Sequence, residues 1–452
     1  MSDKLFSEFQ PVSSKQWKQK IQADLKGADY NDTLVWNTLE GIHVKPFYTH
    51  EDVKENYQLT SKATSWKICQ TIYVADVERS NKNALELLDN GVDSLKFIIP
   101  DEKVQVDKLL RNIPDDITLY FDLKFLSSKF VIALQNSLQG KSYFINTDII
   151  GKLARTGNWF SSLDKDHAQM DSIFKNNPTT NLYVDGSLYQ NAGATIIQQL
   201  AYALSHANEY LNHFQEQLKS NTSLAFHFSV GSNYFFEIAK LRAFRILYES
   251  LAHEYGIATN CHIITTPSKR NKTLYDYNNN MLRTTTEYMS SILGGANCVN
   301  TLAYDDLYHK TNAFGERIAR NQLLVLRHES YFDYVDNPSD GAYNIEDLTT
   351  ELATKAFELF KDIESGGGFI KQLREGIIQK KIKESAQKEQ TLFDEGKLVL
   401  LGSNKHPNPN DKMKDELEIF PFLKHRNEKT LIEPIVKKRL AETYEQNRLK
   451  TE

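Results

Sequence analysis

From about Ser94, short apolar runs alternate along the chain with longer segments in which apolar residues recur at helical spacing. The short runs predict strands. They lie at Ser94–Ile99, Ile117–Leu123, Ser142–Asn146, Asn181–Asp185, Ser223–Val230, Cys261–Thr265 and Cys298–Ala303. The longer segments predict amphipathic helices. The clearest of these are Ala192–Lys219, Tyr234–Tyr255, Asn279–Leu293, Ala313–Arg327 and Ile345–Glu364.

This alternation of strands and helices predicts repeated βα units and therefore a parallel sheet. Seven strands, with an eighth placed in the weak stretch near Tyr331–Val335, favour an α/β fold of the (β/α)8 TIM-barrel type. An open, doubly wound sheet is the alternative. It is less favoured, because no GxGxxG motif opens any of the predicted helices.

Three regions are expected along the chain. Residues 1–70 predict an extended arm that wraps a partner, residues 71–368 the barrel, and residues 369–452 a helical and irregular C-terminal extension. In the extension, Phe369–Glu395 predicts one long polar helix and Leu398–Leu401 a short strand-like run. A helical tail is expected from about Leu431.

Composition narrows the function classes. The 452 residues carry a net charge of −5, which does not favour a general binder of nucleic acid or of membrane surfaces. The chain has three widely spaced cysteines, and its histidines never fall in a metal-ligand spacing. We expect buried thiols in a reducing compartment. Because the amino terminus has no hydrophobic stretch, a cytoplasmic location is expected.

Few residues stand out as candidates for catalysis or ligand binding. Gly366–Gly368 and Gly294–Gly295 predict helix stops, not phosphate cradles. Asp305 and Asp306 follow a strand but point apart, so a capping role is expected for them. His227 and His262 lie among apolar strand residues and predict hydrogen-bonded core histidines. The sequence therefore predicts no catalytic, cofactor-binding or metal-ligating residue.

Several segments together resemble the methylmalonyl-CoA mutase family. They run in the family's order over about residues 34–370: Leu34–Ile42 with Val44–Thr49, Gly193-Ala194, Phe235–Ala243, Asn279–Thr285, Arg317–Asn321 and Gly341–Tyr343. The resemblance implies a (β/α)8 barrel that holds acyl-CoA along its axis, with a cobalamin-binding domain on its mouth. It also implies the radical interconversion of (R)-methylmalonyl-CoA and succinyl-CoA by adenosylcobalamin.

The departures from the family pattern point away from catalysis by this chain. In the segment Trp66–Thr71, Cys69 replaces the family's carboxylate-binding arginine, and Thr71 replaces its tyrosine. A thiol cannot give the bidentate, charge-assisted grip of a guanidinium. Leu188 stands for the histidine that bonds the thioester carbonyl, and Asn300 for another family histidine. Pro267–Asn271 also replaces the polar, small-residue CoA loop.

The family's cobalt-ligating motif, Asp-x-His-x-x-Gly, is absent from the sequence, which ends at Glu452 near where the cobalamin domain would begin. The resemblance therefore implies a small, non-catalytic subunit of a heterodimeric mutase. Adenosylcobalamin and the acyl-CoA substrate are expected on the large catalytic partner, with no cofactor on this chain.

Two alternatives remain open. One is a stand-alone acyl-CoA mutase barrel that uses a separately encoded cobalamin domain. The other is an unrelated metabolic β/α barrel that shares local patterns. The sequence also leaves open whether the barrel axis is a tunnel or is plugged by bulky strand residues such as Phe97, Phe121 and Phe144.

Overall fold

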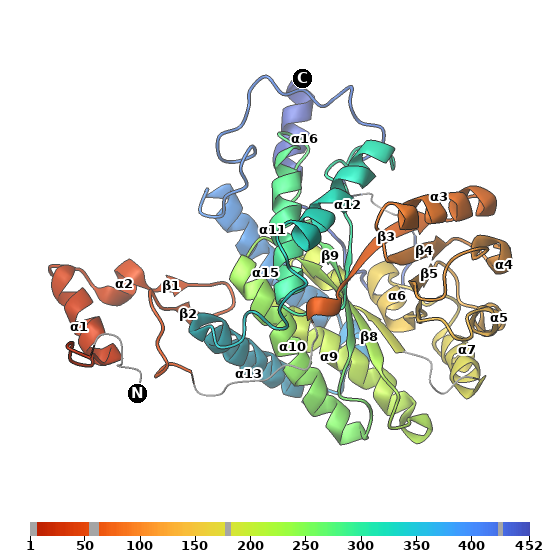
Figure 1. Cartoon of the computed structure of the whole chain (residues 1–452), viewed down its shortest axis with the longest axis horizontal. Coiled ribbons are helices and arrows are strands. Elements are labelled where there is room, and N and C mark those ends of the chain that lie inside the picture. The colour runs from red at the N-terminus through yellow and green to blue at the C-terminus, as the bar shows by residue number, and fades with distance from the viewer. Residues whose placement is uncertain (1–6, 54–62, 177–181, 424–427) are drawn as a thin grey trace.

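The computed structural model describes residues 7–53, 63–176, 182–423 and 428–452. Its centre is an eight-stranded parallel sheet in the order β6-β5-β4-β3-β10-β9-β8-β7, rolled into a nearly closed barrel (Figure 1). The strands are β3 Lys67–Tyr73, β4 Ser94–Ile99, β5 Thr118–Leu123, β6 Tyr143–Asn146, β7 Leu182–Asp185, β8 Leu224–Val230, β9 His262–Pro267 and β10 Cys298–Asn300. The described residues form no ladder between β6 and β7, so the barrel has a seam there. The expected (β/α)8 fold is confirmed.

Strand register decides which side chains face the interior. Phe97 pairs with Phe121 across β4 and β5, and both rings pack in the large outer core between the sheet and the helices. Their neighbours along the strands, Lys96 and Tyr120, therefore point inward, because successive side chains of a strand alternate between faces. Of the three aromatic residues considered for plugging the axis, only Phe144 belongs to the interior cluster.

The expectation of an eighth strand near Tyr331–Val335 is wrong. That stretch is a series of turns, in which Tyr331 has a positive φ of 57°. The missing strand is β3, Lys67–Tyr73, which pairs with both β4 and β10. The boundary expected at residue 70 therefore falls inside a barrel strand. Cys69, Gln70 and Thr71 interrupt the apolar pattern of β3, so the sequence hides it.

Helices cover the outside of the barrel. They are α3 Val77–Asp89, α4 Val106–Leu109, α5 Ser128–Ser137, α6 Ile149–Thr156, α7 Leu163–Asn176, α8 Ser187–Asn191, α9 Ile196–His213, α10 Tyr234–Tyr255, α11 Asn279–Leu293, α12 Ala313–His328 and α13 Tyr343–Ser365. Short 3₁₀ turns lie at Ala63–Ser65 and Gln215–Gln217. The helix stops expected at the glycine runs are confirmed, since α11 ends at Gly294 and α13 ends at Gly366.

The N-terminal arm extends away from the barrel (Figure 1). It contains α1 Ser14–Asp24, α2 Tyr30–Leu34 and the antiparallel pair β1 Trp36–Asn37 and β2 His43–Val44. No residue of α1 is buried. Its contacts are with the arm itself: Trp17 packs edge-to-face on Phe47, with centroids 6.2 Å apart, and Nζ of Lys18 lies 4.5 Å from the ring centroid of Tyr30.

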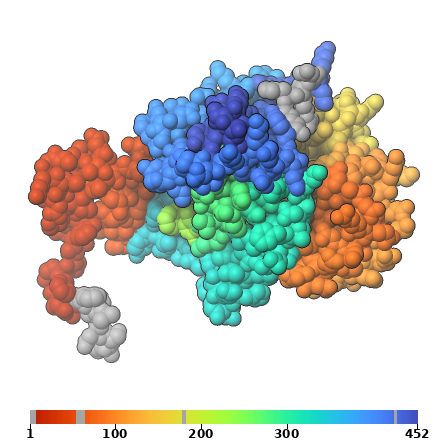
Figure 2. Space-filling model, turned by 90° about the horizontal axis from the view of Figure 1, so that it is seen from above, coloured from red at the N-terminus to blue at the C-terminus, as the bar shows by residue number. Residues whose placement is uncertain are grey.

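The C-terminal extension differs from the single long helix that was expected. Gly376, with a positive φ of 75°, separates α14 Phe369–Arg374 from α15 Ile377–Asp394. Leu401 forms only an isolated bridge with Lys405. Residues 428–441 are extended, and α16 begins only at Glu442, running Glu442–Thr451. Figure 2 shows this late segment lying over the barrel.

Candidate functional site

Aromatic side chains fill the interior of the barrel. The hydroxyl of Tyr120 lies 2.7 Å from Nε2 of His262, and the ring of Phe144 stacks on that imidazole with centroids 4.0 Å apart. Tyr120 also stacks on Phe144, at 5.3 Å. The interior cluster also contains Tyr183, Ile264, Cys69 and Cys298. We call Tyr120, Phe144 and His262 the interior plug.

Burial makes the interior plug uncharged. His262 lies among rings and apolar side chains, and this burial, with Arg245 nearby, lowers its pKa to about 3. Burial raises the pKa of Tyr120 well above its ordinary value. A neutral imidazole that bonds a phenol fits the predicted core histidine, so the interpretation of His262 is confirmed. The three side chains of the interior plug are therefore uncharged packed core.

The residues at the family's substrate-binding positions are only partly brought together. The Oγ1 of Thr71 donates to Oδ1 of Asn300 at 2.9 Å, across β3 and β10. Cys69 lies in the same interior as Cys298, whose Sγ is 3.4 Å from the hydroxyl of Ser94. Leu188, in contrast, is buried with the outer core on α8.

The cysteines are unsuited to nucleophilic chemistry. Burial raises the pKa of Cys69 well above its ordinary value, with Cys298 as a second cause. Burial likewise raises the pKa of Cys261 to about 11. All three thiols are free and buried. Since the thiolate is the nucleophile and the metal ligand, they act as small core residues.

At the carboxyl ends of the strands, charged groups gather around Asp185. Its carboxylate lies 2.9 Å from Nη1 of Arg155 and 3.3 Å from Nδ1 of His227. Burial opposes ionisation of Asp185, but His227 and Arg155 outweigh it and hold its pKa well below the ordinary value. The second ring nitrogen of His227 bonds Thr266 at 2.8 Å. Hence both nitrogens of His227 are occupied, as expected for a bonded core histidine.

A second polar network lies deeper and resembles a relay. Asp148 accepts from Nε2 of His206 at 2.8 Å and from the hydroxyl of Tyr210 at 2.7 Å, and Nδ1 of His206 lies 3.0 Å from the hydroxyl of Tyr189. The side chains of Asp148 and His206 are fully buried. The Asp148 carboxylate also caps α6 through the N–H of Gly151. No substrate could reach this network, so it ties α6, α8 and α9 together.

The extended segment 428–441, here called the strap, crosses the carboxyl end of the barrel. Its backbone N–H groups donate from Ile432 to Gly157, from Ile435 to Ala154, from Lys438 to Asn191 and from Leu440 to Arg270. The helical tail expected from Leu431 is therefore wrong over these residues. The backbone of the strap hydrogen-bonds to residues of the barrel region instead of forming the internal hydrogen bonds of a helix. The local sequence does not indicate these distant partners.

Between the strap and the barrel lies a cavity of about 720 Å³, here called the mouth cavity. Arg155, Lys269 and Lys437 are among the residues that line it. Lys269 pairs with Asp306, which also lines the cavity. Asp305 instead accepts from Asn312, the N-cap of α12, at 2.7 Å, so its expected capping role is indirect.

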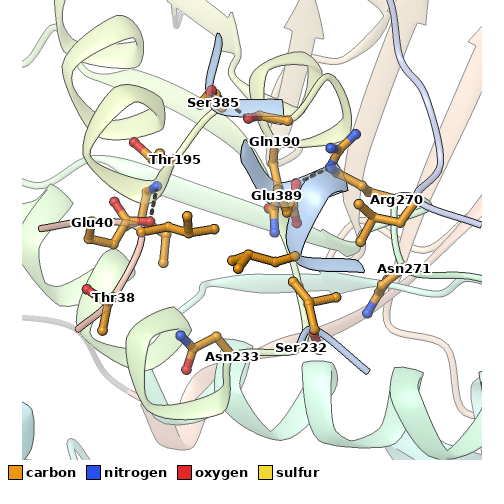
Figure 3. Close-up of a pocket in the computed structure, with 18 of the residues that line it drawn as sticks. Thr38, Glu40, Gln190, Thr195, Ser232, Asn233, Arg270, Asn271, Ser385 and Glu389 are labelled. Atoms are coloured by element: carbon orange, nitrogen blue, oxygen red, sulfur yellow. Dashed lines mark hydrogen bonds and ion pairs between the residues drawn. The ribbon is translucent and has the colours of Figure 1, made fainter. Parts of the chain in front are cut away.

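A further cavity, of about 470 Å³, lies between the arm, α9 and α15 (Figure 3). The carboxylate of Glu40 accepts there from the N–H groups of Ile196 and Ile197, at 2.8 and 3.0 Å. Burial raises the pKa of Glu40 to about 7, although these backbone N–H groups favour the charged form. Arg270 pairs with Glu389 on another wall, at 2.6 Å.

The expectation of no metal site is not overturned: among the described residues, no three His, Cys, Asp or Glu side chains could hold a metal ion together. Nor does any described helix combine the length and apolar character of a bilayer span. The charged groups at the barrel end were missed by sequence reasoning. One signal was available, since Lys96 interrupts the apolar strand Ser94–Ile99 at an inward position.

Comparisons with known proteins agree with this architecture. Residues 130–450 match the family model described as methylmalonyl-CoA mutase. The methylmalonyl-CoA mutase small subunit of Porphyromonas gingivalis is 34% identical over the whole chain and 78% of its own length. The small subunit of Streptomyces virginiae is 28% identical, covering 84% of this chain and 68% of its own.

The methylmalonyl-CoA mutase of Cereibacter sphaeroides is 28% identical over 86% of this chain. The chain spans only 64% of the length of that relative. The matched residues include five of the eight barrel strands, β6 to β10, as well as the strap. This chain therefore belongs to the methylmalonyl-CoA mutase family.

Proposed function

We propose that this chain is the small, non-catalytic subunit of a heterodimeric, adenosylcobalamin-dependent methylmalonyl-CoA mutase in the cytoplasm. The assembled enzyme would be an isomerase that interconverts (R)-methylmalonyl-CoA and succinyl-CoA. The large catalytic subunit would bind both the acyl-CoA and the cofactor. Two relatives named as small subunits support a partner subunit.

The observation that carries the proposal is the interior plug. A substrate tail can run along a barrel axis only if the interior side chains leave a path. Here Tyr120, Phe144 and His262 pack against one another across that axis, as in ordinary eight-stranded barrels whose interiors are filled. The fully buried Tyr183 adds further bulk to the same cluster.

The lost substrate contacts support the same conclusion. Cys69 is buried beside Cys298, and Thr71 is bonded to Asn300, so neither offers a positive charge to a carboxylate. Leu188 lies in the outer core and carries no hydrogen-bond donor.

The end of the barrel does not fit a corrin ligand. An imidazole ligates a metal through a free ring nitrogen, but both nitrogens of His227 are occupied by Asp185 and Thr266. The strap is hydrogen-bonded over the same face, where it contacts Ala154 and Asn191. We therefore derive no reaction step on this chain, and adenosylcobalamin is proposed for the partner, since cofactors of this type carry the radical chemistry.

The arm supplies an interaction surface. Phe9, Val12 and Trp17 are each at least half exposed, and α1 buries none of its residues. Exposed aromatic side chains are often the residues that dominate the binding energy at protein interfaces. We propose that the arm docks on the large subunit. The Glu40 contact with α9 would then fix the base of the arm while α1 reaches the partner.

The test uses the full chain with and without a large methylmalonyl-CoA mutase chain. We expect the two to co-elute in size-exclusion chromatography as one complex with mutase activity. Alone, this chain should show no turnover of succinyl-CoA with adenosylcobalamin. Turnover by this chain with only a separate cobalamin domain would establish the stand-alone mutase barrel instead. Failure to associate with any large subunit would also contradict the proposal.

A further inference from the structure

The mouth cavity is electrostatically unusual for this protein. The whole chain has a net charge of −5, yet the cavity is lined by six cationic side chains against three acidic ones. The six are Arg155, Lys269, Arg270, Lys437, Lys438 and Arg439. A concentration of one sign within a cavity focuses the potential and attracts a ligand of the opposite sign.

Protein carboxylates neutralise only part of this charge. Arg155 pairs with Asp185, Lys269 with Asp306, Arg270 with Glu389 and Arg439 with Glu445. Lys437 and Lys438 form no ion pair within the described part of the chain. These two exposed ammonium groups are therefore without an ion pair, although the Asp185 carboxylate acts on Lys437, and Glu428 and Glu442 also line the cavity.

A third unpaired ammonium lies below the cavity. Lys96 points into the barrel from β4, level with Thr71 on one side and Tyr120 on the other, and its residue is only 7% exposed. It has no ion pair or hydrogen bond to any described residue. Its charge therefore adds to the positive potential at this end of the barrel.

The titration of neighbouring groups agrees with an excess of positive charge. Burial lowers the pKa of Lys437 to about 8, and the nearby cations Arg155, Lys269 and Lys96 lower it further while Asp185 opposes them. Lys437 lines the cavity and is exposed, so its ammonium is accessible to solvent. Burial, followed by Lys96, also lowers the pKa of His227, which stays neutral.

We propose that the mouth cavity binds a small oxyanion, a phosphate or carboxylate group, held between Lys437 and Arg155, with Lys96 adding positive potential from the barrel side. Arg155 uses Nη1 for Asp185, and its other nitrogens remain for the ligand. Charge-assisted bonds from ammonium and guanidinium groups are the strong contacts by which proteins hold such anions. This binding site goes beyond the proposed subunit role, because it needs neither partner nor cofactor.

The test is isothermal titration calorimetry of the full chain at pH 7 and low salt, with inorganic phosphate and acetate as separate probes. Saturable binding of either probe is expected, and the probe that binds more tightly identifies the ligand class. In Lys437→Gln we expect at least tenfold weaker binding. Lys82→Gln is the control, because Lys82 is 80% exposed on α3 and is absent from the cavity lining. Thermal unfolding would verify that both variants fold.

A pH series adds a second readout. Acetate keeps a single charge over this range, so its affinity for the unmodified chain should fall between pH 7 and pH 9 as Lys437 loses its proton, with a pKa of about 8. Lys437→Gln should lose this part of the pH dependence. Absence of binding for both probes, or binding that Lys437→Gln leaves unchanged, would overturn the proposal.

Discussion

The phenolic oxygen of Tyr120 lies 2.7 Å from Nε2 of His262, across the inside of the barrel from β5 to β9. This bond satisfies the polar tips of two buried rings at the same time. It also holds both rings in the axis, where Phe144 stacks on the imidazole. Packing and function are thus connected, because the bond that stabilises the interior also closes the path a substrate tail would need.

Tyr120→Phe removes one partner of that bond and leaves the ring nitrogen of His262 buried without a hydrogen bond. We expect a loss of about 1–3 kcal/mol in the free energy of unfolding, measured by urea denaturation. Tyr331→Phe is the matched control, since Tyr331 is 59% exposed, and it should change stability by less than about 0.5 kcal/mol. Equal effects of the two substitutions would show that the interior bond contributes nothing.

Trp17→Ala tests the arm as the partner-binding element. Trp17 is 50% exposed on α1, so the stability of the isolated chain should stay within about 0.5 kcal/mol. Its dissociation constant for the large subunit should rise about thirtyfold, equivalent to about 2 kcal/mol, as for an aromatic anchor. Surface plasmon resonance measures the change. Leu282→Ala, at an exposed position on α11, should bind like the unmodified chain; an unchanged affinity in Trp17→Ala would remove the arm from the interface.

Glu40 predicts a pH-dependent contribution to stability. Its pKa rises from 4.5 to about 7 on folding, chiefly through burial, so the folded state binds the proton more tightly than the unfolded state. The stabilisation is full below pH 4.5 and is lost as the pH rises to 7, by up to about 3 kcal/mol.

Glu40→Gln isolates this effect, because the amide cannot titrate while its carbonyl still accepts a backbone N–H. As the pH rises from 4.5 to 7, the unfolding free energy of the unmodified chain should fall relative to that of Glu40→Gln. Urea denaturation measures both free energies. Glu51→Gln, at an exposed position of the arm, is the control and should give a flat difference. A flat difference for Glu40→Gln as well would mean that Glu40 does not titrate in this range.

The burial of the three cysteines predicts that no thiol reacts rapidly in the native state. Burial holds the thiols away from reagent, and it raises the pKa of Cys69 and of Cys261, which leaves little thiolate at pH 7. Ellman's reagent should find no rapidly reacting thiol in the folded chain and three in denaturant. A thiol that reacts within seconds under native conditions would contradict the packed interior, and sequential Cys→Ser variants would identify it.

Local pattern revealed much of the fold. The bounds of α10 and α11 agree with the predictions residue for residue, because each helix has apolar residues at helical spacing and a glycine at its C-terminal end, Gly256 and Gly294. The strand β4 was predicted with equal accuracy. The strand β3 was missed, since Thr71 and Gln70 are stabilised by partners that lie far along the sequence, such as Asn300.

The candidate site was less accessible to prediction. Replacement of the family's carboxylate-binding residues by Cys69 and Thr71 is visible in the sequence, and it already argues against catalysis. The plugging of the axis depends on register, because Phe144 faces inward while Phe97 and Phe121 face the helices. Three phenylalanines on neighbouring strands therefore face different sides of the sheet. Only the position of each one in the in-and-out alternation of its strand decides the side.

Taken alone, the order of apolar and polar residues determined the αβ alternation, the type of barrel and the family, since these depend on periodicities and motifs within short stretches. Only the tertiary structure decided that the axis is filled, that the strap crosses the barrel mouth and that the charge of Lys96 acts on Lys437. Lys96 and Lys437 are separated by 341 positions along the chain. Side chains so far apart in the sequence interact only because the closure of the barrel brings them close in space.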